Sequence, residues 1–200
     1  MEVKHQFIDM AFFTPNWKAE ILVLGTFNPS CGEQVDYFYG RNRNKFWKAI
    51  RLTFKSSENS LTTLEDKLSF LRKHQIACMD MIQKVIVNDP TKVNDLINGY
   101  SDQKLFGGIR DKSLERVYNT QNIKNYLEKF EPKKVLHTWG NRNNPVEFRN
   151  EITELKQFCK IKKILFIDDC PSPSNRSRTT VELISRFYTK HIKTNIDKTS

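Results

Sequence analysis

The sequence lacks the cysteine and histidine patterns that hold structural metals. It has four cysteines and four histidines in 200 residues, and no two cysteines form a CxxC pair. Zinc and iron–sulfur sites need such ligands at short spacings. We therefore expect reduced thiols, no metal cluster and no cofactor.

Long apolar runs are missing too. No stretch approaches the roughly 18 apolar residues that a membrane-spanning helix needs. No apolar run follows a basic start, as it would in a signal peptide. Internal repeats and low-complexity tracts are also absent from the sequence. We expect a cytoplasmic protein with no membrane partner.

Positive charge and aromatic residues are abundant. Lysine and arginine number 33 against 23 aspartate and glutamate, a formal net charge of +10, and 14 residues are phenylalanine. Such a balance favours polyanionic partners, because binding phosphates releases condensed counterions. The length suits one sizeable core. We expect a single domain over 1–200, with a core from about 18 to 190 and a flexible tail over 192–200.

Short apolar runs alternate with amphipathic patterns along the chain. The apolar runs cover 21–27, 75–82, 133–139 and 162–168. The helical patterns cover 45–54, 62–74, 120–130, 145–158 and 179–191. Apolar runs of this kind are typical of parallel strands covered on both faces. Their alternation with helices predicts an α/β fold with a mainly parallel central sheet.

Local signals mark two helix starts and one irregular segment. Asn44 is expected to cap the helix that begins at residue 45, and Thr63 with Asp66 forms a capping pair for the next helix. Segment 88–118 has a weak pattern and includes Gly107-Gly108. We interpret it as an irregular connection.

Two loops that follow apolar runs concentrate unusual residues. Ligands of open parallel sheets bind beyond the carboxyl ends of the strands, which directs attention to these loops. In the first loop Asn28 precedes Pro29, on a stiff elbow where its amide can hold a water or a carbonyl group. The same pair also fits an ordinary Asn-Pro turn.

The second loop, CPSPSNRSR at 170–178, alternates proline with serine and leads into a helix. A helix N-terminus favours phosphate groups, although the loop also fits a passive surface connection. Other aromatic and acidic residues near strand ends have two interpretations. Asp80, His137 and Trp139 fit either a cleft wall or a buried structural role. Phe46 and Trp47 are expected in the core, from their helical spacing.

Two stretches of sequence together resemble the first signature of the uracil-DNA glycosylase superfamily. They are ILVLGTFNPS at 21–30 and FYGRNRNKFWKAI at 38–50, which are most similar to the mismatch-specific and hypoxanthine-DNA glycosylase branches. The loop at 170–178 resembles the second signature, which enters the minor groove. LRKHQIACMDMI at 71–82 resembles the Asp-containing strand of the hypoxanthine branch. The resemblance implies a three-layer α/β/α fold with a central, mainly parallel four-stranded sheet.

The resemblance also implies a function and a set of site residues. The function is that of a monofunctional DNA glycosylase of base-excision repair, which hydrolyses the N-glycosidic bond of a flipped, deaminated base, uracil or hypoxanthine. Its partner is duplex DNA with a damaged or mismatched base. We expect a monomer, cytoplasmic or nucleoid-associated. The implied residues are Asn28 and Asn44 for orienting water, Phe27, Phe38 and Tyr39 for the base, and Arg41, Arg43, Ser172, Ser174, Asn175, Arg176 and Arg178 for DNA.

The chain departs from the family pattern at two places. Its first signature reads Gly-Thr-Phe-Asn-Pro, one residue longer than Gly-x-Asn-Pro, so Asn28 and Asn44 both remain candidates for positioning the water. Cys170 stands where some branches have a histidine that stabilises the departing base anion. Two alternatives therefore stay open: an inactive relative that binds nucleic acid, and an enzyme that acts on free nucleosides or nucleotides.

Overall fold

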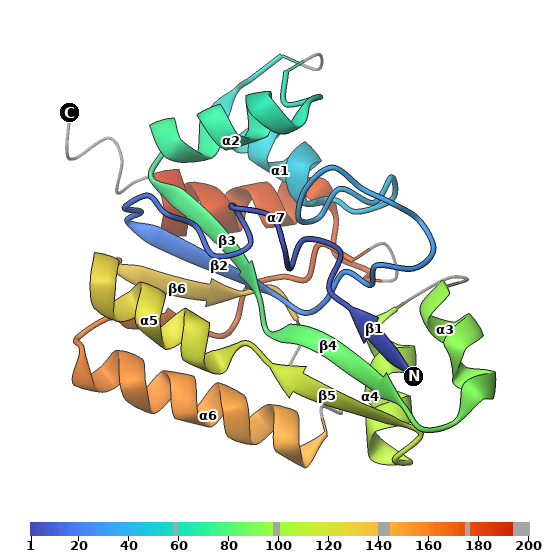
Figure 1. Cartoon of the computed structure of the whole chain (residues 1–200). Coiled ribbons are helices and arrows are strands. Elements are labelled where there is room, and N and C mark those ends of the chain that lie inside the picture. The colour runs from blue at the N-terminus through green and yellow to red at the C-terminus, as the bar shows by residue number, and fades with distance from the viewer. Residues whose placement is uncertain (58–59, 98–100, 140–144, 175–176, 194–200) are drawn as a thin grey trace.

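The computed structural model describes residues 1–57, 60–97, 101–139, 145–174 and 177–193 (Figure 1). The strands are β1 (Glu2–Lys4), β2 (Ile21–Gly25), β3 (Ile76–Asp80), β4 (Ile82–Val87), β5 (Leu114–Tyr118), β6 (Lys134–His137) and β7 (Leu165–Ile167). The helices are α1 (Phe46–Phe54), α2 (Leu64–Lys73), α3 (Val93–Ile97), α4 (Asp102–Arg110), α5 (Thr120–Phe130), α6 (Val146–Ile161) and α7 (Val181–Tyr188). A 3₁₀ turn, Pro90–Lys92, precedes α3, and a π-helical turn, Thr189–Lys193, follows α7.

A four-stranded parallel sheet forms the middle layer. Its strands lie in the order β3-β2-β6-β7, and every neighbouring pair is parallel. Ile21 and Val23 of β2 face one side of this sheet, whereas Leu22 and Leu24 face the other, and all four are fully buried. Burial on both faces explains why the run is apolar throughout.

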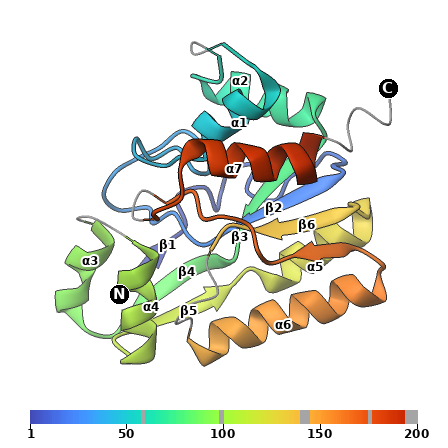
Figure 2. The ribbon, with the colours of Figure 1, turned by 180° about the vertical axis from the view of Figure 1, so that it is seen from behind.

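Helices cover both faces of this sheet (Figures 1 and 2). Ile123 of α5 and Leu155 of α6 pack in the cluster that contains Leu22 and Leu24. Helices α1, α2 and α7 supply the opposite cluster. The structure therefore has three layers, α/β/α, and it confirms the expected fold.

A second, antiparallel sheet extends the fold in the order β1-β4-β5 (Figure 1). Only Met81 separates β3 from β4, so the run at 75–82 is divided between two sheets. The expected start of the core near residue 18 is wrong, because Val3, Phe7 and Phe13 are already buried. Pairing of β1 with β4 brings this N-terminal segment into the core.

The interpretation of 88–118 as an irregular connection is also wrong. The segment contains α3, α4 and β5. A Cβ atom at Gly108 would lie only 2.5 Å from the Leu114 side chain, so this glycine allows α4 to pack closely on β5. A residue that resembled a break in the sequence is therefore a requirement of packing.

The ends of the elements follow local rules in part. Thr63 and Asp66 form the expected capping box at the start of α2. The expected tail begins too early, because Ile192 is fully buried in the π-helical turn. The rest of that tail, 194–200, lies outside the described residues.

Candidate active site

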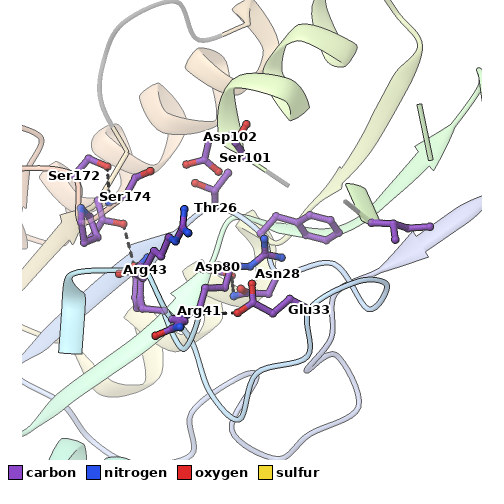
Figure 3. A pocket seen from close by; sticks show the side chains of 17 residues that line it. Thr26, Asn28, Glu33, Arg41, Arg43, Asp80, Ser101, Asp102, Ser172 and Ser174 are labelled. Carbon is purple, nitrogen blue, oxygen red and sulfur yellow. Dashed lines mark hydrogen bonds between the residues drawn. The ribbon is translucent and has the colours of Figure 1, made fainter. Parts of the chain in front are cut away.

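A cavity of about 530 Å³ opens at the carboxyl ends of the parallel strands. Loops that follow β2, β6 and β7 line it, together with the end of β3 and the segment before α1, and their side chains meet in Figure 3. Open parallel sheets bind ligands at this position. The predicted site residues that line the cavity are Phe27, Asn28, Tyr39, Arg41, Arg43, Asn44, Ser172 and Ser174.

Asn28 is held by a buried carboxylate at the end of β3. Its Nδ2 donates a hydrogen bond to Oδ2 of Asp80 over 2.9 Å, and both residues are less than a tenth exposed. A carboxylate can only accept hydrogen bonds, so it fixes the amide with its NH₂ group toward Asp80. The carbonyl oxygen of the Asn28 side chain is then left to serve as an acceptor on the cavity wall.

The side-chain amide of Asn44 is held by its oxygen, whereas that of Asn28 is held by its NH₂ group. Oδ1 of Asn44 accepts the backbone N–H of Phe46 over 2.9 Å, which is a local turn that starts α1. The expected role of Asn44 as N-cap is therefore shifted by one residue, since the N-cap position belongs to Lys45. With the oxygen engaged, the NH₂ group is the part of this amide that remains for a ligand.

Tyr39 is placed by contacts at both ends of its ring. The ring stacks on Phe46 at a centroid distance of 4.2 Å, and its hydroxyl lies 3.1 Å from Oγ1 of Thr138. The Thr138 hydroxyl donates its hydrogen bond to the Leu24 carbonyl, so the Tyr39 hydroxyl is the donor in its hydrogen bond with Thr138. Burial raises the pKa of the Tyr39 hydroxyl well above its ordinary value, so it stays protonated.

The neighbouring ring, Phe38, turns the other way. Phe38 is fully buried among Phe7, Phe12 and Tyr37 and is not part of the cavity wall. Its expected contact with a base therefore has no support in the geometry. Tyr39 has a left-handed backbone (φ 60°), which lets consecutive rings diverge between core and cavity.

Gly25, the last residue of β2, is required where Asp80 and Tyr39 approach the strand. A Cβ atom there would lie 2.1 Å from Oδ1 of Asp80 and 2.9 Å from the Tyr39 hydroxyl. Only glycine allows both groups to lie against the backbone at this point.

The two loops with signature-like sequences meet through Lys45. The backbone N–H of Lys45 donates to the carbonyl of Pro173 over 2.9 Å. Its ammonium group donates to the carbonyls of Ser177 and Thr179, at 2.8 and 2.7 Å. These bonds place Ser172 and Ser174 beside the segment that contains the two arginines (Figure 3).

The other residues singled out in the sequence do not line the cavity or lie outside the described residues. Arg178 is exposed and does not line the cavity. Asn175 and Arg176 lie outside the described residues. Phe46 and Trp47 are buried, as expected.

Cys170 is buried as well, beyond the cavity wall. Burial raises the pKa of its thiol. Cys170 therefore offers the cavity neither a charge nor a hydrogen bond in place of histidine.

His137 and Trp139 have the buried structural role. Their rings stack at 4.4 Å, and Nδ1 of His137 donates to the Trp139 carbonyl over 3.0 Å. Burial lowers the pKa of His137 to about 4, so the ring is neutral at pH 7. Neither residue lines the cavity.

The cavity is also lined by residues that no sequence motif predicted. Thr138 directly follows β6, so its position at the carboxyl end of a strand could have indicated that it lines the site. Ser101 and Asp102 come from the segment interpreted as irregular, and Glu33 lies in a loop without a pattern. Glu33 and Asp102 place carboxylate groups on the cavity wall, and Glu33 lies beside Arg41 (Figure 3), which no local motif indicates.

Neither a metal group nor a membrane span is found in the described part of the chain. No cluster of three or more histidine, cysteine, aspartate or glutamate side chains that could hold a metal occurs among the described residues. Within the same residues, no helix is long and apolar enough to cross a bilayer.

The chain has a three-layer α/β/α fold around a parallel sheet, and this fold is like that of a solved structure named as a uracil-DNA glycosylase. A solution NMR structure described as "a putative Uracil DNA glycosylase from Methanosarcina acetivorans" matches the chain with a TM-score of 0.53, at 15% identity. The match covers 90% of this chain and 94% of the other. At this identity the likeness establishes the fold alone. No protein-family model and no curated protein matches the chain.

Proposed function

We propose that this protein is a monofunctional DNA glycosylase of the mismatch-specific or hypoxanthine type, which releases uracil or hypoxanthine from duplex DNA. The observation that carries the proposal is the convergence of three features on one cavity. These are an oriented amide at Asn28, an aromatic ring at Tyr39 and the proline-serine loop at 172–174. A flipped base needs a stacking surface, a water in line with its glycosidic bond and a grip on the backbone.

Asn28 is the residue that orients the attacking water. Its side-chain carbonyl accepts a hydrogen bond from the water, because Asp80 occupies the NH₂ end of the amide. Asn44 is less suited to this role, since its oxygen is bonded to Phe46. A neutral amide is a weak base, so most of the rate enhancement comes from positioning and from preorganised dipoles.

The base binds between the aromatic and amide groups of the wall. Tyr39 offers a ring surface for stacking, and Phe27, which is only 4% exposed, borders the same cavity. The NH₂ group of Asn44 donates to a keto oxygen of the base, an interaction that strengthens as negative charge moves onto the departing base. Uracil and hypoxanthine both have such an oxygen, whereas the bases from which they form by deamination have an amino group there.

The DNA backbone follows the two joined loops. Arg41, Arg43, Ser172 and Ser174 lie together along one wall of the cavity. Arginine and serine are common donors to phosphate oxygens. The net charge of +10 strengthens this binding at low salt.

Base release under single-turnover conditions tests the proposal. Duplex oligonucleotides that contain uracil, hypoxanthine, xanthine or a thymine mismatch are incubated with excess protein, and free deoxyuridine and deoxyinosine are included. We expect release of uracil or hypoxanthine from DNA, slowed about 100-fold or more in Asn28→Ala and unchanged in Asn125→Ala, an exposed asparagine on α5. Release from free nucleosides alone would contradict a DNA glycosylase.

One observation favours the rival, a protein that binds nucleic acid without cutting it. Cys170 faces the core, so the position that has a histidine in some branches supplies nothing to the cavity. Such a binder would retard the same oligonucleotides on a gel with a steep dependence on salt. It would leave every glycosidic bond intact.

A further inference from the structure

The N-terminal segment braces the loop that contains Asn28. His5 forms an antiparallel bridge with Pro29. The backbone N–H of Gln6 donates to the Asn28 carbonyl over 2.7 Å, and that of Ser30 donates to the Lys4 carbonyl over 2.8 Å. The elbow is therefore tied on both sides of Asn28 to a strand from the start of the chain.

The same segment brings a buried imidazole beneath the cavity. His5 is 1% exposed, and the rings of Phe7, Phe13 and Phe27 surround it at centroid distances of 4.9 to 5.7 Å. Its Nδ1 accepts the backbone N–H of Phe7 over 3.1 Å. An acceptor nitrogen has no proton, so the proton of the neutral ring is on Nε2.

That proton is directed at the carboxylate that holds Asn28. His5 Nε2 lies 2.8 Å from Oδ2 of Asp80, the same oxygen that accepts Nδ2 of Asn28 at 2.9 Å. The imidazole and the amide both donate to this one carboxylate oxygen, so the two hydrogen bonds converge on Asp80 and link the three side chains.

We propose that His5 is a positioning residue, which acts through Asp80 to keep the side-chain carbonyl of Asn28 toward the cavity. This inference rests on the proposed function, in which Asn28 orients the water. Without the imidazole, the buried Asp80 carboxylate has lost one of the two side-chain donors that the described residues supply, and it is free to rotate. A rotated carboxylate no longer fixes the Asn28 amide, which can then turn its NH₂ group toward the water site.

A matched pair of substitutions separates this role from simple packing. In His5→Gln the side-chain NH₂ occupies the place of Nε2 and still donates to Asp80. In His5→Asn the shorter amide can still accept the Phe7 N–H but cannot reach Asp80. We expect His5→Asn to slow base release about 10- to 100-fold, as loss of a hydrogen bond that orients a site residue commonly does, with DNA affinity within about threefold of the parent. We expect His5→Gln to retain most of the rate.

A double-variant test asks whether His5 acts through Asn28. In an Asn28→Ala background that has measurable residual activity, His5→Asn should have no further effect. Two results would overturn the role of His5. One is that His5→Gln slows base release as much as His5→Asn does. The other is that His5→Asn slows release in the Asn28→Ala background by the same factor as in the parent. A parent protein that releases no base overturns the proposed function instead.

The tautomer can be measured without any substrate. Long-range ¹H–¹⁵N NMR spectra of the full-length protein should show His5 with its proton on Nε2. A proton on Nδ1 would reverse the hydrogen bonds and overturn the inference, whatever the catalytic result.

Discussion

The backbone N–H of Lys45 donates to the carbonyl of Pro173 over 2.9 Å, which ties the start of α1 to the loop after β7. The ammonium group of the same lysine adds bonds to Ser177 and Thr179. Two stretches from different quarters of the chain thereby form one wall of the cavity.

Removing the ammonium group should loosen this connection. In Lys45→Met two charge-assisted hydrogen bonds are lost, each worth about 1.5–3 kcal/mol to local order, and we expect base release to slow about tenfold at subsaturating DNA. Lys48→Met, an exposed change in the same helix, is the control. If base release slows equally in both variants, the lost positive charge is responsible, and not the lost connection between the loops.

The two asparagines should behave differently. We expect Asn28→Ala to lower the single-turnover rate by about 100-fold or more, because the water loses its acceptor. Asn44→Ser keeps an acceptor for the Phe46 N–H but removes the NH₂ group, so we expect weaker transition-state binding with little loss of stability. Single-turnover rates and thermal unfolding distinguish these effects, and an inert Asn28→Ala would reject this residue as water positioner.

The ring of Tyr39 should matter more than its hydroxyl. Tyr39→Phe loses the bond to Thr138, a loss of about 1 kcal/mol in stability, and keeps the ring. Tyr39→Ala removes the stacking surface, worth about 1–3 kcal/mol per base, and should weaken binding of damaged DNA about 10- to 100-fold. Affinity is measured on oligonucleotides with a non-hydrolysable glycosidic bond; equal behaviour of the two variants would argue against stacking.

Two glycines offer opposite outcomes for the same substitution. Gly25→Ala places a methyl group 2.1 Å from Oδ1 of Asp80, so we expect displaced Asp80 and Asn28 side chains and loss of base release. Gly107→Ala meets no atom within 4 Å and lies inside α4, so it should raise stability by about 0.5–1 kcal/mol. Urea unfolding and activity assays check both. Full activity in Gly25→Ala would show that the close approach is dispensable.

Stability should fall in mild acid because of His137. Its pKa is about 4 in the folded protein, lowered by burial from an ordinary value of 6.5, so the unfolded chain binds the proton first as pH falls. The stabilisation from the neutral ring is present above pH 6.5 and is lost as pH decreases toward 4. Between pH 7 and 4.5 we expect a loss of about 2 kcal/mol from this group.

The control is His137→Asn, whose amide can keep the donor to the Trp139 carbonyl but does not titrate. Urea unfolding of both proteins across this pH range isolates the contribution of the imidazole. The same pH slope in the two proteins would contradict it.

Local pattern was sufficient for much of the architecture. The apolar run at 21–27 and the helical spacing at 120–130 predicted β2 and α5, because strand and helix periodicity are properties of neighbouring residues. The Asn28–Pro29 elbow and the serine loop were found for the same reason: each follows directly on a strand. The chain order of strands and helices then placed both loops at one edge of the sheet.

Contacts between distant residues were out of reach. His5 had no motif around it, and only the pairing of β1 with β4 brings it to Asp80. Phe38 and Tyr39 are alike in sequence, yet the positive φ at Tyr39 sends one ring to the cavity and the other to the core. Glycine at 108 resembled a break until Leu114 was packed against it.

The sequence by itself determined most strands and helices of the parallel, three-layer part of the fold and the loops that carry polar residues. The tertiary structure decided which way each amide points, which ring meets the cavity and which residue supports Asp80. The reason is physical: hydrophobic periodicity is encoded by adjacent residues, whereas the direction of a hydrogen bond depends on partners that only the folded chain brings within 3 Å.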